Sequence, residues 1–259
     1  MARAHTPRLV AALLLLAAAV AILASLGRWQ LQRADERRAI LAAIEAGRTQ
    51  PPLTLAPGTP AAELAAWRPA RAQGQWQDDL SVLLENRNQG GRPGYWLATP
   101  LVLDAARHQA VLVLRGWLPR HADGRSPQLP AVPAGPQSVT GELAPRVPRL
   151  FELWSLGASR ASLPASLPAG VMPPVVQNLD LSDYARATGL TLLPVVLMQT
   201  QGDDALVRDW PQPSVDYNQN LGYALQWFSF AGIAAIAWLV VAARAWRRAR
   251  RGPSSHTGR

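Results

Sequence analysis

The sequence predicts a membrane protein in which two transmembrane helices flank a mainly antiparallel β (α+β) domain. Three observations lead to this fold class. An uncharged apolar run lies near each end of the 259-residue chain, and all acidic residues fall between these runs. In the same central segment, short runs rich in Val, Leu and Trp alternate with turn residues.

The two apolar runs set the domain boundaries. Residues 9–26 and 221–243 carry no charge, and eighteen helical residues span roughly 27 Å, close to the hydrocarbon thickness of a bilayer. The predicted organisation is therefore a tail (1–8), a first span (9–26), a β-rich domain (27–220), a second span (221–243) and a basic tail (244–259). A cleavable signal peptide is the alternative for the first run, which contains alanine triplets at 17–21.

The net charge of +9 comes almost entirely from the tails. Two arginines precede the first span and six follow the second, whereas eighteen arginines nearly balance seventeen acidic residues between them. This distribution argues against nucleic-acid binding. Basic tails beside apolar spans indicate that both termini are cytoplasmic and that the central domain is periplasmic. Four arginines just beyond the first span, at 28, 33, 37 and 38, favour the opposite orientation.

Periodicity predicts the elements between the spans. The first helix should continue to Gly47, because apolar residues recur at helical spacing up to that point. A short helix is expected at 61–67, and a second one should begin with Ser182 as its cap and end at Gly189. Residues 157–174 are predicted to form a mobile surface loop without a site. Strands are expected at 70–76, 81–85, 96–103, 110–117, 139–143, 175–178 and 194–200. A closed or strongly curved sheet would best hide the edges of these strands.

Motifs for catalysis and metal binding are lacking. The sequence has no cysteine, no nucleophile elbow, no phosphate-binding glycine loop and no His-based zinc motif. We therefore predict that the chain is not an enzyme and has no metal site. The adjacent pairs Asp78-Asp79 and Asp203-Asp204 are interpreted as solvated turn residues, and His108 and His121 as surface histidines.

Residues at the membrane boundary are more informative. Trp29, Tyr223 and Trp227 suit the headgroup level, because their rings have apolar faces and polar edges. In the second span, Gly222, Gln226, Ser229 and Ile233 share one face at helical spacing. An amide loses hydrogen bonds in lipid, so this face is expected to meet the first helix or a partner, or to line a cofactor groove.

Four sequence motifs resemble those of the surfeit locus protein 1 family. They occur along the chain in the same order as in that family. They are Leu26-Gly27-Arg28-Trp29-Gln30-Leu31-Gln32-Arg33, Gly94-Tyr95-Trp96-Leu97-Ala98-Thr99-Pro100-Leu101, Arg115-Gly116-Trp117-Leu118-Pro119 and Asn220-Leu221-Gly222-Tyr223-Ala224-Leu225-Gln226-Trp227-Phe228. The resemblance covers about residues 26–243.

The resemblance implies assembly of haem-copper cytochrome c oxidase, at or near insertion of haem a into the catalytic subunit. It also implies a bacterial inner membrane location. The implied partners are that subunit and other oxidase assembly proteins, in addition to membrane lipid. Many family members carry a His, the proposed haem ligand, where this sequence has Asn220. An Asn amide is a poor ligand for haem iron. Haem a is therefore the cofactor that the resemblance allows, but direct binding is not assigned and a scaffold or docking role is expected.

The predicted docking surface combines the boundary residues with the motifs. Trp29, Gln30, Asn220, Tyr223, Gln226 and Trp227 are expected to form it, with the strand end at Arg115 and Trp117 lying over it. Two alternatives remain open. One is a haem-carrying protein that takes a ligand from His108, His121 or a partner. The other is a membrane-anchored structural or sensory module unrelated to respiration.

Overall fold

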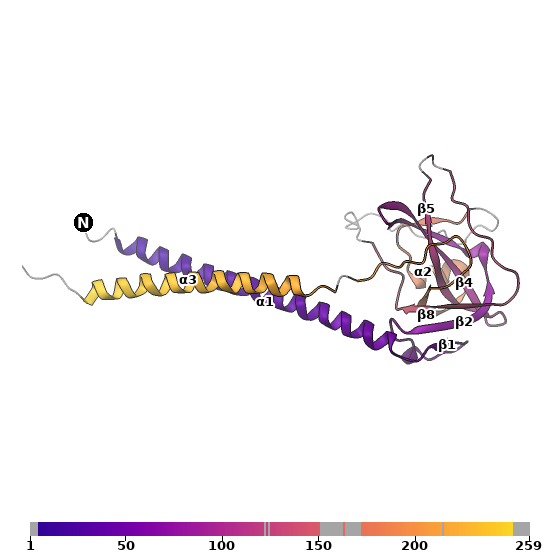
Figure 1. The fold of residues 1–259 in the computed structure, drawn as a ribbon, viewed down its shortest axis with the longest axis horizontal. Coiled ribbons are helices and arrows are strands. Elements are labelled where there is room, and N and C mark those ends of the chain that lie inside the picture. Colours follow the sequence, from indigo (N-terminus) through magenta and orange to yellow (C-terminus); the bar gives the residue numbers. More distant parts are fainter. Residues whose placement is uncertain are drawn as a thin grey trace, which may run out of the picture. The chain divides into compact units, whose positions relative to one another are not determined.

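The computed structural model describes residues 5–121, 123, 125–150, 163, 172–213 and 215–250. The chain divides into two compact units, both drawn in Figure 1. Residues 1–42 and 213–259 form one unit, called the helix pair, and residues 43–212 form the other, called the β domain. Most of the loop predicted at 157–174 lies outside the described residues.

The helix pair contains most of α1 (His5–Arg48) and all of α3 (Asn218–Arg250). Both helices are long and apolar enough to cross a membrane. The predicted continuation of the first helix to Gly47 is confirmed, since α1 ends at Arg48. The two helices contact each other along their apolar segments, where the Trp238 indole donates a hydrogen bond to the carbonyl of Leu13 at 3.1 Å. The chain is thus a two-span membrane protein with a central β domain.

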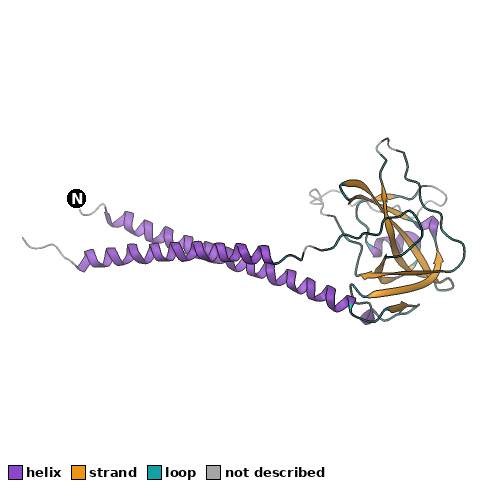
Figure 2. Ribbon diagram, in the orientation of Figure 1, coloured by secondary structure: helices purple, strands orange, loops and turns teal. Residues whose placement is uncertain are grey.

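The β domain is built from a single eight-stranded sheet (Figure 2). Its strands are β1 (Leu53–Leu55), β2 (Pro69–Trp76), β3 (Val82–Gln89), β4 (Arg92–Asp104), β5 (Gln109–Pro119), β6 (Gln137–Ala144), β7 (Val175–Val176) and β8 (Thr191–Gln199). All seven predicted strands are present. The three-residue strand β1 was not among the predicted strands.

Strand pairing closes part of the sheet into a barrel. The order is β1-β2-β6-β8-β5-β4-β3-β7, and an additional pairing of β2 with β4 joins five of these strands in a ring. Most pairs are antiparallel, but β5 pairs with β8 in parallel. Closure removes exposed edges from the five central strands, which confirms the expectation of a closed sheet.

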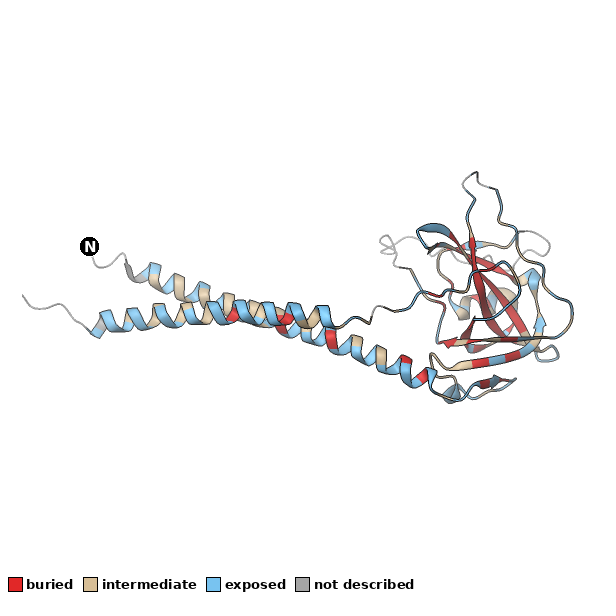
Figure 3. Ribbon diagram, viewed as in Figure 1, coloured by how far each residue is buried: buried red, intermediate tan, exposed pale blue. Residues whose placement is uncertain are grey.

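Two apolar clusters lie on opposite faces of the sheet. Along β5, Val111 and Val113 belong to one cluster and Leu112 and Leu114 to the other. All four side chains are fully buried, and in Figure 3 the buried positions are concentrated on the strands. A strand with both faces covered reads as a continuous apolar run, as β5 does.

Three short helical elements complete the β domain. The expected helix at 61–67 is only a 3-10 turn, η1 (Ala61–Glu63), and a second such turn, η2 (Asp78–Leu80), precedes β3. The helix α2 (Leu181–Thr188) ends at Gly189 in a left-handed conformation, as predicted. Its cap is Asp180 rather than Ser182, because the Asp180 carboxylate accepts hydrogen bonds from both the backbone N–H and the hydroxyl of Ser182.

Candidate functional site

The face of α3 that packs on α1 differs from the predicted one. Ala224 and Ala231 are buried, whereas Gln226 and Ser229 are exposed and Ile233 is 64% exposed. A side chain added at Gly222 would meet nothing within 4 Å. The expectation that this polar face meets the first helix is therefore wrong. The face remains without a partner among the described residues.

Small residues explain which face was selected. Asn220, which is hydrogen-bonded to α1, and the buried Ala224 and Ala231 each lie two residues before a member of the predicted face, which is roughly 200° around the helix. Alanine at two of these positions lets the helix backbones approach closely. On the α1 side the matching residue is Gly27, where an added Cβ would lie 2.8 Å from the Phe228 ring.

The helix pair brings four of the predicted site residues together. Trp29, Gln30, Asn220 and Tyr223 line one cavity of about 470 Å³ between α1 and α3. The Asn220 side chain donates a hydrogen bond from Nδ2 to Gln30 Oε1 at 2.8 Å. The sequence placed both residues at the same membrane boundary, but it did not predict this direct contact.

Gln226 and Trp227 are not among the residues that line this cavity. Gln226 is exposed and follows Gln219 by seven residues and Tyr223 by three, which leaves it within roughly 60° of both cavity residues around the helix. Trp227 is half-buried with its ring edge-on to Phe230 at a centroid distance of 6.2 Å. The predicted docking residues of α3 therefore divide between the cavity lining and a neighbouring exposed strip deeper in the span.

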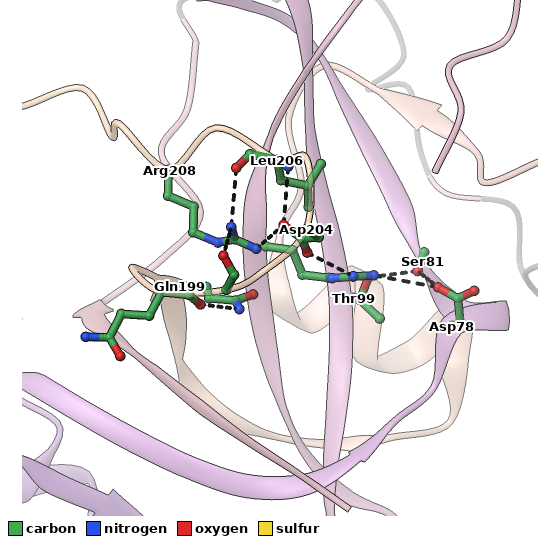
Figure 4. A network of polar contacts seen from close by, with 10 residues as sticks. Asp78, Ser81, Thr99, Gln199, Asp204, Leu206 and Arg208 are labelled. Carbon is green, nitrogen blue, oxygen red and sulfur yellow. Dashed lines mark hydrogen bonds and ion pairs between the residues drawn. The ribbon is translucent and has the colours of Figure 1, made fainter. Parts of the chain in front are cut away.

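Arg115 lies in the β domain with its side chain only 3% exposed. Its guanidinium lies 3.4 Å from the Asp204 carboxylate and 4.0 Å from that of Asp78, and 5.1 Å from the Trp76 ring centroid. Burial lowers the pKa of Arg115, and the two carboxylates partly offset this effect. Figure 4 shows Asp78, Asp204 and Arg208 in this network. Asp204 also pairs with Arg208, so the acidic turns at 78 and 204 carry structural ion pairs.

Trp117 is also a buried residue of the β domain. Its indole donates a hydrogen bond to the carbonyl of Arg87 at 2.8 Å. The Arg87 guanidinium, which sequence reasoning missed, is buried above the Trp96 ring and donates to the Gln177 carbonyl. Burial lowers the pKa of Arg87 to about 10. Whether Arg115 and Trp117 lie over the docking surface stays a prediction.

The residues around Asn220 offer no imidazole, thiolate or thioether for axial ligation of haem. Among the usual types of iron ligand, only the phenol of Tyr223 lines the cavity, and Tyr223 is 46% exposed. The Asn220 amide is a poor iron ligand and is already hydrogen-bonded to Gln30. We therefore derive no step through haem at this cavity. Among the described residues of the whole chain, no group of three or more His, Cys, Asp or Glu could hold a metal ion.

His108 and His121 are both exposed and flank β5 at its two ends. Because β5 has eleven residues, the two histidines are separated by roughly 36 Å along the strand. They cannot ligate one iron together, so a haem-carrying role would depend on one of these exposed histidines or on a ligand from a partner.

The chain has two membrane helices that flank a partly closed β barrel in the sequence, which places it in the class of two-span membrane proteins with a central β domain. The family model described as the SURF1 family matches residues 17–232. The chain belongs to the SURF1 family, which confirms the resemblance read from the four motifs. It is 26% identical to a SURF1-like protein of Rickettsia bellii, over 88% of this chain and 87% of that protein. It is 28% identical to an uncharacterized SURF1-like protein of Mycobacterium bovis, over 72% of this chain and 64% of that protein.

Proposed function

We propose that this chain is an assembly factor for haem-copper cytochrome c oxidase and docks the nascent catalytic subunit through α3. SURF1 family proteins are known as cytochrome oxidase assembly factors, and membership rests on a match over most of the chain. The observation that carries the proposal is the polar face of α3. Its residues Gly222, Gln226 and Ser229 are turned away from α1.

The Gln226 amide is exposed within a membrane span, where it needs a hydrogen-bond partner from another helix. Gln226 lies five residues after the start of the apolar run, roughly 7 Å into the span. Its amide has no hydrogen-bond partner among the described residues, whereas Ser229 already donates to the Leu225 carbonyl. In lipid, such a group is stabilised by an interhelical hydrogen bond. Gly222, with nothing near it, allows a partner helix to approach closely.

The proposed location is the inner membrane, with both termini in the cytoplasm and the β domain in the periplasm. The arginines after the second span support this orientation. Protease added to spheroplasts should cleave the β domain and spare a tag placed after Arg259. Digestion of the tag with protection of the β domain would overturn the orientation.

The docking proposal is tested in a strain that lacks this gene. A plasmid with the natural gene should restore the haem a signal in a reduced-minus-oxidised spectrum and oxygen consumption by the oxidase. A plasmid with Gln226→Leu and Ser229→Leu, two exposed residues of the polar face, should restore neither, although the protein reaches the membrane at normal abundance. The matched control is Leu239→Ala, an exposed apolar residue off the polar face, which should restore both.

The result separates the remaining functions. Normal haem a and oxidase activity with the double variant would exclude this face as the docking site. Normal haem a and activity without the gene would favour a membrane module unrelated to respiration. A haem absorption band on the purified chain that disappears with His108→Ala or His121→Ala would favour the haem-carrying alternative.

A further inference from the structure

The cavity between α1 and α3 lies where both helices leave their apolar runs. Nine residues line it: Trp29, Gln30, Arg33, Glu36, Arg37, Ile40, Gln219, Asn220 and Tyr223. Trp29 follows the last residue of the first span by three positions, and Tyr223 is near the start of the second. Trp and Tyr prefer the headgroup level, so the cavity is at headgroup depth and extends away from the hydrocarbon along α1.

The cavity presents a positively charged wall. Arg33 and Arg37 are one helical turn apart, and Glu36 is the only acidic residue among the lining residues. Arg33 pairs with Glu36 at 3.2 Å and its guanidinium lies over the Trp29 ring, while Arg37 donates to the Asp216 carbonyl. A guanidinium has five N–H donors, so each arginine keeps donors for a further acceptor. An anionic group such as a phosphate is favoured here.

Besides an anionic group for the arginines, a ligand of this cavity should carry a hydrogen-bond donor for Asn220. Its Nδ2 donates to Gln30, but its Oδ1 is buried and has no hydrogen-bond partner among the described residues. A buried acceptor without a donor is destabilising. A ligand that supplies an N–H or O–H to this amide, in addition to a phosphate for the arginines, would satisfy both groups.

We propose that this cavity binds the headgroup of a phospholipid that carries a hydrogen-bond donor, such as the ammonium of ethanolamine or a hydroxyl of glycerol. The phosphate lies against Arg33 and Arg37, and the donor reaches Asn220. The acyl chains run along the apolar segments of the helices. Phosphatidylcholine has the same phosphate but no N–H or O–H. Because Arg33 covers the Trp29 ring, that ring is not free to bind its quaternary ammonium.

The test uses the purified full chain in detergent and native mass spectrometry with added lipids of identical acyl chains. Phosphatidylethanolamine and phosphatidylglycerol should be retained at least about tenfold better than phosphatidylcholine, as expected for one charge-assisted or buried hydrogen bond. Arg37→Gln should reduce retention of all three lipids. Asn220→Leu should abolish the preference over phosphatidylcholine. Arg28→Gln is the matched control, because Arg28 is exposed on α1 near Trp29 but does not line the cavity.

A second variant keeps the test decisive if Asn220→Leu does not fold. Asn220→Asp preserves the size of the side chain and adds a negative charge, so it should favour phosphatidylethanolamine over phosphatidylglycerol. Equal retention of phosphatidylcholine by the natural protein would overturn the proposal. Equal effects of Arg28→Gln and Arg37→Gln would do the same. If soluble glycerophosphoethanolamine displaced the lipid at an equal concentration, the site would be one for free phosphate esters.

Discussion

Arg115 of the β domain and Gln226 of the helix pair differ in burial and in the charged or polar groups that lie beside them. In the β domain, the nearly inaccessible Arg115 is flanked by Asp204 and Asp78. In the helix pair, Gln226 is turned away from α1 and has no hydrogen-bond partner among the described residues. A paired polar group inside a domain contributes to that domain's stability. An unpaired one on a membrane helix leaves hydrogen-bonding capacity for another chain.

This comparison predicts that substitutions in the two units will separate stability from function. Substitution of buried polar residues in the β domain should lower the free energy of unfolding. Substitution of polar residues on the exposed face of α3 should reduce oxidase assembly and leave the free energy of unfolding unchanged. Four substitutions test this, in order of decreasing expected effect on the free energy of unfolding.

Arg115→Met should destabilise the β domain the most. Removing the guanidinium leaves Asp204 with Arg208 alone and breaks a buried ion pair, at a cost of about 3 kcal/mol. Denaturant unfolding of the full chain in detergent, followed by Trp fluorescence, measures the loss. Arg107→Met is the control, because the ion pair of Arg107 with Asp104 is on the surface and should contribute less than about 1 kcal/mol. Equal losses of unfolding free energy in the two variants would show that the buried Arg115 ion pair stabilises the protein no more than the surface ion pair of Arg107.

Gly27→Leu should weaken the helix pair. An added Cβ already lies 2.8 Å from the Phe228 ring, and overpacking costs typically about 1–3 kcal/mol. Gly27→Ala should cost less, because the Phe228 ring can shift. Thermal unfolding of the purified full chain in detergent measures the loss. An unchanged unfolding temperature with Gly27→Leu would contradict the contact.

Asp180→Ala should destabilise α2 by about 1 kcal/mol, the typical contribution of a helix cap. Hydrogen bonds from the Ser182 hydroxyl and backbone N–H hold the pKa of Asp180 below its ordinary value of 3.8. Its contribution is therefore present above that value and is lost as the pH falls through the lower, folded-state pKa. The difference in unfolding free energy between the natural protein and Asp180→Ala should be largest at pH 7 and should shrink as the pH falls through the lowered, folded-state pKa of Asp180. An equal difference above and below that pKa would argue against the carboxylate as the cap.

Gln226→Leu should leave the free energy of unfolding unchanged within about 0.5 kcal/mol, since Gln226 is exposed. We nevertheless expect it to lower oxidase assembly in cells. Thermal unfolding of the purified chain and the haem a spectrum of membranes measure the two effects. A clear loss of stability would mean that Gln226 has a structural contact within this chain, and the distinction between the two units would fail.

The sequence predicted much of the fold because local patterns specify it. The spans follow from the length of uncharged chain that a bilayer requires, and all seven predicted strands were found because runs of β-branched and aromatic residues separated by turns rarely form anything else. The end of α2 at Gly189 was also correct, since the left-handed conformation there favours glycine. Its cap was wrong because Asp180 and Ser182 are both good caps, and only the chain geometry distinguishes them.

The site was predicted less completely. Trp29, Gln30, Asn220 and Tyr223 were predicted to share one membrane boundary, and all four line one cavity of the helix pair. Orientation could not be read, because positions 222, 226, 229 and 233 and positions 220, 224, 227 and 231 follow the same helical spacing. The burial of Arg115 was likewise out of reach, since Asp78 and Asp204 come from turns far apart in the sequence.

By itself, the sequence determined the two spans, the β-rich segment between them and the motifs of the SURF1 family, because each depends on residues that are close together in the chain. Only the tertiary structure decided which face of α3 meets α1, how β2 and β4 close the barrel, and which acids pair with Arg115. These contacts join distant segments, and their selection depends on shape and close packing, which local periodicity does not encode.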